Sequence, residues 1–113
     1  MKQLEKVFKV LADKNRLRIL KLLEKKKMCV CELAYILGIT QPSTSRHLKK
    51  LRGAGLIKDE QEGFWTNYFL STACCHYAKT LMKNLYAWLN DDPLIKSDLE
   101  KARKINRCEL CGK

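Results

Sequence analysis

Residues 31–51, CELAYILGITQPSTSRHLKKL, contain a short apolar helix, a tight turn and a longer helix with one polar face, and they decide the fold. Gly38 is placed to end the first helix, because glycine readily adopts the left-handed conformation that follows helix C-termini. Thr40 is placed to cap the second helix, and Pro42 stands in its first turn, where a missing N–H is tolerated. We therefore predict a helix-turn-helix.

A hairpin follows this unit. Residues 56–58 and 64–70 are rich in β-branched and aromatic side chains, which is typical of strands, and the charged residues 59–63 are expected to form the turn between them. We interpret this hairpin as a wing beside the helix-turn-helix. The predicted fold class is therefore mainly α with a small β-hairpin wing.

Helices are also predicted on both sides of this region. Upstream, apolar residues at i, i+3, i+4 and i+7 indicate an amphipathic helix near the N-terminus, and Asp13 is placed to cap the next helix. Downstream, an apolar stripe from Tyr77 to Leu89 indicates a long helix that residues 90–93 end, and a charged helix is expected over about 94–105. We predict two parts, a winged domain over 1–92 and a helix with a cysteine-containing tail over 93–113.

The large apolar residues of the terminal helices predict a two-fold homodimer. A chain of 113 residues buries only roughly 65% of its unfolded surface, so its small core does not easily cover both helices. The alternative is that these side chains pack within their own domain. The candidate interface residues are Phe8, Leu11, Leu81, Leu85 and Trp88.

Charge points to a polyanionic partner. The chain has 23 Lys and Arg against 12 Asp and Glu, a net charge of +11, which suits nucleic acid. No run approaches the ~18 apolar residues of a membrane span, and charges stand where a signal peptide needs an apolar stretch. We expect a cytoplasmic protein with no membrane partner, in which the 6 cysteines stay reduced and serve as ligands or sensors.

The polar face of the second helix is the predicted contact with double-stranded operator DNA. Arg46 is suited to a guanine edge, and serine, lysine and glutamine are suited to phosphates and mixed base edges. His47 lies between the polar and apolar faces and is equally suited to a structural hydrogen bond. The predicted DNA-binding residues are Gln41, Ser43, Ser45, Arg46, Lys49 and Lys50, with Lys58 in the wing.

Cys29 and Cys31 stand directly before this unit. Residues i and i+2 of a helix point roughly 200° apart, so the two thiols can chelate one ion only if Cys29 lies at or before the helix start. Cys108 and Cys111 form a C-x-x-C pair whose spacing also suits one metal. Adjacent Cys74 and Cys75 are expected to be buried or spare thiols. Soft thiolate sets select soft ions, so a thiol-bound metal or metalloid is the predicted controller of DNA binding.

Taken together, these segments resemble the ArsR/SmtB family of winged-helix metal-sensing repressors. The resemblance is carried by residues 11–20, 29–33, 41–51 and 55–57 with the wing, and it covers roughly residues 3 to 90. It implies a homodimer that represses its own operon and releases DNA when an inducer binds. It also implies that arsenite or antimonite would take three thiolates. In arsenic-sensing relatives a third cysteine follows one turn after the second, where this chain has Ala34, so Cys108 or Cys111 is expected to complete the site.

Other interpretations remain open. Cadmium, lead or zinc would use four thiolates, and a thiol redox or persulfide switch on the same fold would need two cysteines within disulfide distance. A small thiol oxidoreductase using Cys108 and Cys111 is not expected, because that pair lacks the strand-then-helix setting of the redox motif. We therefore predict a regulator rather than an enzyme.

Overall fold

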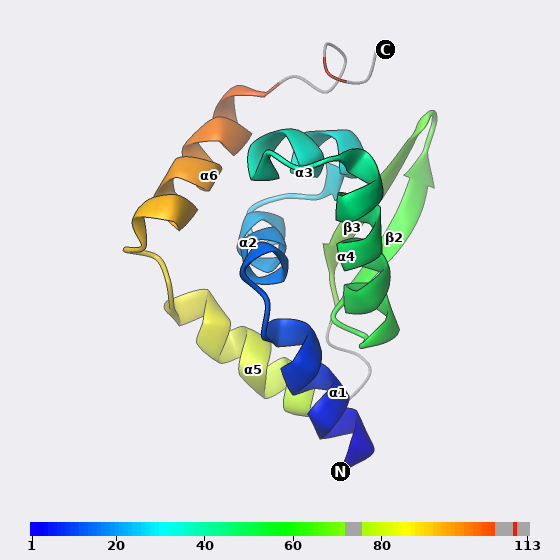
Figure 1. The fold of residues 1–113 in the computed structure, drawn as a ribbon, viewed down its shortest axis with the longest axis vertical. Coiled ribbons are helices and arrows are strands. Elements are labelled where there is room, and N and C mark those ends of the chain that lie inside the picture. Colours follow the sequence, from blue (N-terminus) through cyan, green and yellow to red (C-terminus); the bar gives the residue numbers. More distant parts are fainter. Residues whose placement is uncertain (72–75, 106–109, 111–113) are drawn as a thin grey trace.

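The computed structural model describes residues 1–71, 76–105 and 110, and its elements agree with the predicted winged helix-turn-helix (Figure 1). In chain order they are α1 (Lys2–Leu11), α2 (Lys14–Leu23), β1 (Met28–Cys29), α3 (Val30–Leu37), α4 (Gln41–Gly53), β2 (Ile57–Glu62), β3 (Trp65–Leu70), α5 (His76–Ala87) and α6 (Pro93–Lys104). Within the described ranges, no helix is long and apolar enough to cross a membrane.

The helix-turn-helix consists of α3 and α4, and its predicted turn is confirmed. Gly38 adopts a left-handed φ of 72°, and its N–H donates to the carbonyl of Ala34 at 2.9 Å. Thr40 then caps α4, because its Oγ1 accepts from the backbone N–H of Ser43 at 3.2 Å. These two local signals set the angle between the helices.

The wing is longer than predicted, and a third strand extends its sheet. The antiparallel sheet has the order β1-β3-β2, and Glu62 pairs with Trp65, so the turn contains only Gly63 and Phe64. The prediction of a charged turn over 59–63 is therefore wrong. Since β2 is an edge strand, its acidic side chains reach solvent and cations, as Asp59 does in its 2.8 Å ion pair with Arg52.

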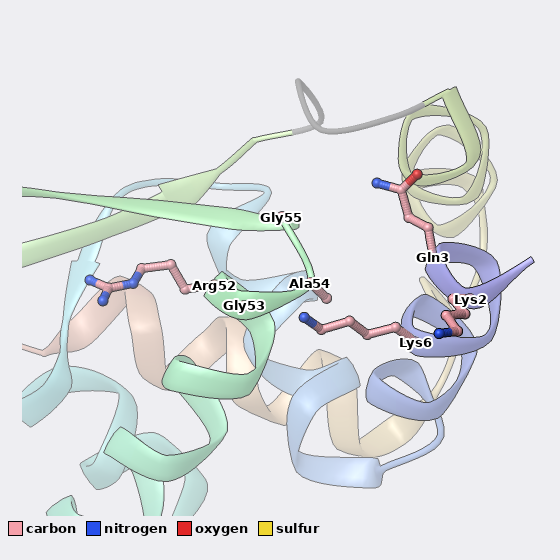
Figure 2. A pocket seen from close by; sticks show the side chains of 7 residues that line it. All are labelled: Lys2, Gln3, Lys6, Arg52, Gly53, Ala54 and Gly55. Atoms are coloured by element: carbon pink, nitrogen blue, oxygen red, sulfur yellow. The ribbon is translucent and has the colours of Figure 1, made fainter.

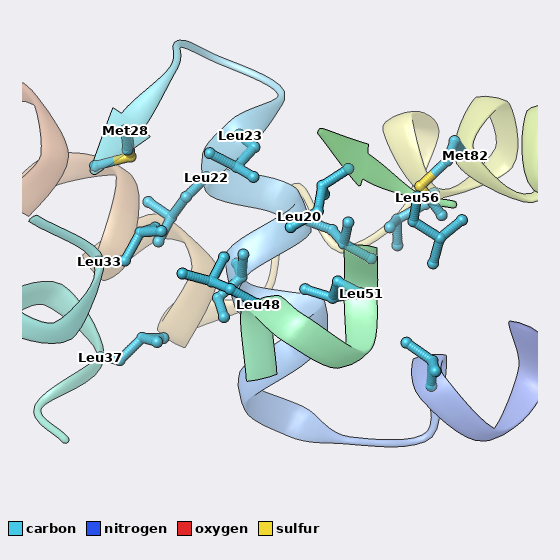
Figure 3. Close-up of a cluster of buried hydrophobic side chains, with 14 of the residues drawn as sticks. Leu20, Leu22, Leu23, Met28, Leu33, Leu37, Leu48, Leu51, Leu56 and Met82 are labelled. Carbon is cyan, nitrogen blue, oxygen red and sulfur yellow. The ribbon is translucent and has the colours of Figure 1, made fainter. Parts of the chain in front are cut away.

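The core surrounds α2, which lies in the middle of the molecule, with α5 and α6 on one side and α4 and the sheet on the other (Figures 1 and 3). Ile19 and Leu20 of α2 are fully buried, and Figure 3 shows Leu20 among side chains of α4, α5 and the segment before β2. Leu48 and Leu51 of α4 pack on this cluster with exposed fractions of 1% and 0%. Burial of one face of α4 leaves its opposite face for a partner.

A buried lysine binds the C-terminal end of α5, which stops at Ala87, although the apolar stripe predicted a helix that reaches Leu89. The ammonium of Lys21 donates to the carbonyl of Leu85 at 2.9 Å and approaches that of Tyr86 at 3.4 Å. The Leu85 carbonyl also accepts from the backbone N–H of Trp88 at 3.0 Å, which tightens the last turn, so backbone and lysine together satisfy the carbonyls at this helix end. Leu89 instead adopts a left-handed φ of 66° and starts the turn into α6.

A second buried cation holds α6 against α2 and α3. Arg18 donates to the carboxylate of Asp98 in α6 at 2.8 and 2.9 Å. Its guanidinium also lies 3.4 Å from the carbonyls of Ile36 and Leu37 at the end of α3. Hydrogen bonding to Asp98 raises the pKa of Arg18. Arg18 therefore joins the C-terminal helix to the first helix of the helix-turn-helix.

Candidate DNA-reading surface and thiol site

The outward face of α4 carries the side chains that the sequence assigns to DNA. Gln41, Ser45, Arg46, Lys49 and Lys50 are exposed, and Ser43 is half-buried. Arg46 donates through Nη2 to the Oγ of Ser43 at 2.9 Å, so the two lie on one face as their spacing predicts. This face is rigid, because the opposite side of α4 is anchored in the core.

The same face is strongly positive. Among the described residues, no ion pair is formed by Arg46, Lys49 or Lys50. Lys58 of β2 adds an exposed cation from the wing. Trp65 and Tyr68 of the wing are half-buried, and burial raises the pKa of Tyr68, which agrees with a packing role. A row of unneutralised cations of this kind suits the phosphates of duplex DNA.

His47 has a structural partner at the start of α2. Its Nδ1 lies 3.3 Å from Nη1 of Arg16 and 4.0 Å from Oδ1 of Asp13. Burial is the main cause that lowers the pKa of His47, while the charge of Asp13 acts to raise it. The imidazole is therefore neutral at pH 7 and accepts from Arg16. Of the two roles considered for His47, this geometry favours the structural hydrogen bond.

Cys29 lies at the start of α3, as chelation by Cys29 and Cys31 requires. It is the N-cap residue with extended φ and ψ of −92° and 170°, and it is 2% exposed. It forms a capping box with Glu32: the carboxylate of Glu32 accepts from the N–H of Cys29 at 3.0 Å, and the Cys29 side chain accepts from the N–H of Glu32. The backbone of Cys29 also pairs with Asn67 of β3. This residue therefore connects the wing sheet to α3.

Cys31 directly contacts α4, the helix predicted to read DNA and called the reading helix below. The sequence did not predict this contact. Its half-buried Sγ accepts a hydrogen bond from Nε2 of Gln41, the first residue of α4, at 3.4 Å. Their separation by ten positions in the chain hides this proximity. A spacing argument that follows the α3–turn–α4 geometry could have found it.

A third ligand is not found among the described residues, where no three His, Cys, Asp or Glu side chains gather around a common point. Ala34 takes the position one turn after Cys31 and is buried. Cys74 and Cys75, like Cys108 and Cys111, lie outside the described residues. The pair at the start of α3 thus fits a thiolate-binding ion only when further donors join it.

The predicted dimer residues line one apolar hollow. A cavity of about 410 Å³ between α1 and α5 is lined by Phe8, Leu11, Leu81, Leu85 and Trp88, among others. Phe8 and Trp88 are 53% and 56% exposed, which is unusual for such large apolar groups. Leu85 differs from them, because it is 6% exposed and belongs to the core of the single chain.

Comparison with known proteins places these features in a family. Residues 13–59 match the model described as bacterial regulatory protein, arsR family. The chain is 38% identical over 93 residues to the arsenic resistance transcriptional regulator ArsR1 of Pseudomonas putida, a match that covers 78% of this chain and 73% of that protein.

Two further relatives differ in what their names say they respond to. The arsenical resistance operon repressor of Escherichia coli is 48% identical over 66 residues, or 58% of this chain and 56% of that protein. The cadmium resistance transcriptional regulatory protein CadC of Listeria innocua is 36% identical over 64 residues, a match that covers 56% of this chain and 54% of that protein.

Solved structures with this fold include reduced HlyU of Vibrio cholerae, with a TM-score of 0.68 and 28% identity over 79% of this chain and 90% of that chain. A homodimeric winged helix-turn-helix DNA-binding domain of Mycobacterium bovis has a TM-score of 0.66 and 27% identity over 76% and 77% of the two chains.

Proposed function

The chain belongs to the arsR family of bacterial regulatory proteins, DNA-binding transcriptional repressors rather than enzymes, and we propose that arsenite or antimonite is its inducer. In this proposal a homodimer binds operator DNA through α4 and the wing. Binding of the inducer to Cys29 and Cys31 then releases the DNA. The proposed site of action is the cytoplasm, where the operator is found.

The contact between Cys31 and Gln41 carries the proposal. The sulfur lies 3.4 Å from the amide Nε2 at the first residue of the reading helix. A metalloid bound to the Cys31 thiolate would move the sulfur and redirect its lone pairs, and in this proposal that change weakens the hydrogen bond by which α3 holds the start of α4. Coupling free energies of ~1–3 kcal/mol are typical of linked sites, and the net value of one hydrogen bond, about 0.5–1.5 kcal/mol, overlaps the lower part of that range.

The chemistry of the sulfur pair favours a soft inducer. A bound metalloid supplies a soft, thiophilic centre, and its ligands must be thiolates. Cys29 is suited to that state, because its side chain faces a backbone N–H at the positive end of α3. We propose Cys108 and Cys111, from the same or the partner subunit, as the source of the remaining sulfur. Arsenic in the names of two relatives supports this choice over other ions.

Cadmium is the second candidate, with lead and zinc as related possibilities. The cadmium-named relative supports it, and a four-thiolate site would use both Cys108 and Cys111 together with Cys29 and Cys31. The number of sulfur ligands therefore separates the candidates. Loss of either tail cysteine alone leaves three thiolates for arsenite but removes one of four from cadmium.

The test is a titration of DNA release in reducing buffer with arsenite, antimonite, cadmium, lead and zinc in turn. We expect arsenite or antimonite to act at the lowest concentration, and Cys29→Ser or Cys31→Ser to bind DNA normally but no longer release it. Release of DNA by Cys29→Ser at the parent's inducer concentration would refute the thiol site. Release by mild oxidation without metal, with a new disulfide, would favour the redox switch instead.

A further inference from the structure

A basic hollow lies between the first turn of α1 and the C-terminal end of α4 (Figure 2). Its volume is about 400 Å³, and the residues that line it include three cations and no acid. Arg52 is one of these cations, but its guanidinium is bound to Asp59 at 2.8 Å and points away from the other two in Figure 2. The positive charge at the hollow therefore comes from Lys2 and Lys6 of α1.

Both lysines are available to a ligand. Lys2 and Lys6 are exposed, and among the described residues neither forms an ion pair. Lys9 of the same helix differs from them, because it lies 4.0 Å from the carboxylate of Glu5. The unneutralised charge of α1 is thus concentrated at the end of the helix that borders α4.

These lysines continue the basic face of the reading helix. Arg46, Lys49, Lys50 and Gly53 have the i, i+3, i+4 and i+7 spacing of one helix face. The Nζ of Lys6 lies 4.0 Å from the point where a Cβ on Gly53 would be. The Lys6 ammonium therefore lies beside Gly53, where the cations of α4 end, and one row of positive charge runs across both helices.

The length of α4 brings the end of this row to the edge of a DNA groove. A rise of about 1.5 Å per residue places Gly53 roughly 15 Å along the axis from Ser43. The major groove is only ~12 Å wide. When residues near Ser43 meet base edges, the end of α4 reaches the sugar–phosphate backbone that borders the groove.

We propose that Lys2 and Lys6 bind phosphodiester oxygens of that backbone, so that α1 forms part of the DNA interface. This inference rests on the proposed DNA binding by α4. The contact adds affinity without sequence preference, because phosphates carry no base identity. It extends the protein–DNA surface beyond the helix-turn-helix and the wing.

Lys6 also stands at the negative end of the α4 dipole, where a cation stabilises a helix. A purely structural Lys6 would change the melting temperature of the protein and leave the salt dependence of DNA binding unaltered. A phosphate contact changes the salt dependence, since each neutralised phosphate releases condensed counterions. The salt slope therefore distinguishes the two roles.

The experiment compares the parent protein with Lys2→Gln/Lys6→Gln on a mixed-sequence DNA duplex at several salt concentrations. The control, Lys96→Gln/Lys101→Gln, removes the same charge from exposed positions of α6, on the opposite side of α2 from the wing (Figure 1). We expect the slope of log affinity against log salt to become shallower by roughly 2 to 4 for the α1 variant of the dimer, and not for the control.

An unchanged slope in the α1 variant overturns the inference, whether or not its melting temperature falls. An equal change in the control also overturns it, because net charge and not position would then explain the effect. A parent protein that binds no duplex overturns the proposed function itself, and that result is separate from binding with an unchanged slope.

Discussion

Nε2 of Gln41 donates to Sγ of Cys31 across 3.4 Å, so the first residue of the reading helix is held by a thiol of the helix before it. Gln41→Ala removes this connection and, as Gln41 is also a predicted DNA contact, should weaken DNA binding modestly. The ratio of DNA affinities without and with inducer should fall at least threefold, because typical coupling is worth roughly 5–150-fold.

The control for this prediction is Ser45→Ala, an exposed change on α4. It should lower DNA affinity and leave the inducer ratio as it is. A Gln41→Ala protein with the parent's ratio would show that this contact takes no part in release. Both affinities can be measured by fluorescence anisotropy of a labelled duplex.

Arg46 is expected to be the main specificity contact, since its exposed guanidinium is positioned by Ser43 at 2.9 Å. Arg46→Ala should weaken operator binding by about 1–3 kcal/mol, the value of one bidentate base contact. Arg103→Ala is the matched control, because Arg103 is an exposed arginine of α6 whose partner, Glu100, lies 2.8 Å away. Equal operator affinity in the two variants would refute the assignment of the reading face.

Trp88 offers the sharper test of the dimer surface, because Leu85 is part of the single-chain core and its change would disturb folding. Trp88→Glu places a charge in the apolar hollow and should weaken the dimer by about 2 kcal/mol or more, as expected at an interface hot spot. Sedimentation velocity would then show monomer. Tyr86→Glu, an equally exposed position of α5 outside the hollow, should leave the dimer intact.

Asp98 compensates the buried charge of Arg18, and both side chains are largely shielded, with exposed fractions of 2% and 10%. Asp98→Ala should lower the free energy of unfolding by about 3–5 kcal/mol, since it leaves a buried guanidinium without its counterion. Urea unfolding measures the loss. Asp91→Ala, an exposed change just before α6, is expected to cost little. Similar losses in the two variants would contradict the anchoring of α6 by Arg18.

His47 should make the protein sensitive to mild acid. Its folded-state pKa lies below the ordinary value of 6.5, chiefly because of burial, so below that pH the unfolded chain takes up the proton more readily. Stability is therefore unaffected above pH 6.5 and falls as the pH decreases through the folded-state pKa. The acid-induced fall in melting temperature should be smaller in His47→Gln than in the parent. His76→Gln, which alters an exposed histidine, should behave as the parent does.

Local signals predicted the helix-turn-helix well because each acts within a few residues. Asp13 caps α2 through the N–H of Arg16 at 3.0 Å, and Gly38 ends α3, both as expected. The wing was predicted less well, because the charged sequence of β2 is typical of a turn. Its strand conformation depends on pairing with β3, and its acidic side chains depend on cations from other elements. β1 has only two residues and exists only through its pairing with β3.

The parts that sequence reasoning missed depend on long-range partners. Arg18 and Asp98 are 80 residues apart, and Lys21 reaches a carbonyl 64 residues away, so no helical period reveals them. Lys21 binds the C-terminal end of α5, and Arg18 holds α6 against α2 and α3. For the site, the position of Cys29 followed from geometry, whereas the Cys31 partner required the folded turn.

Cys29 belongs to the sheet and to the helix at once, because its backbone pairs with Asn67 while it caps α3. A displacement of Cys29 would therefore move both the wing and the helix-turn-helix, because this one residue is joined to each of them through hydrogen bonds. No flexible segment lies between Cys29 and either unit. For protein engineering, this makes residues 28–34 a compact module. Under the proposed function, replacing Cys29 and Cys31 with other ligands would change what the protein detects, while the face of α4 proposed to read DNA keeps its sequence.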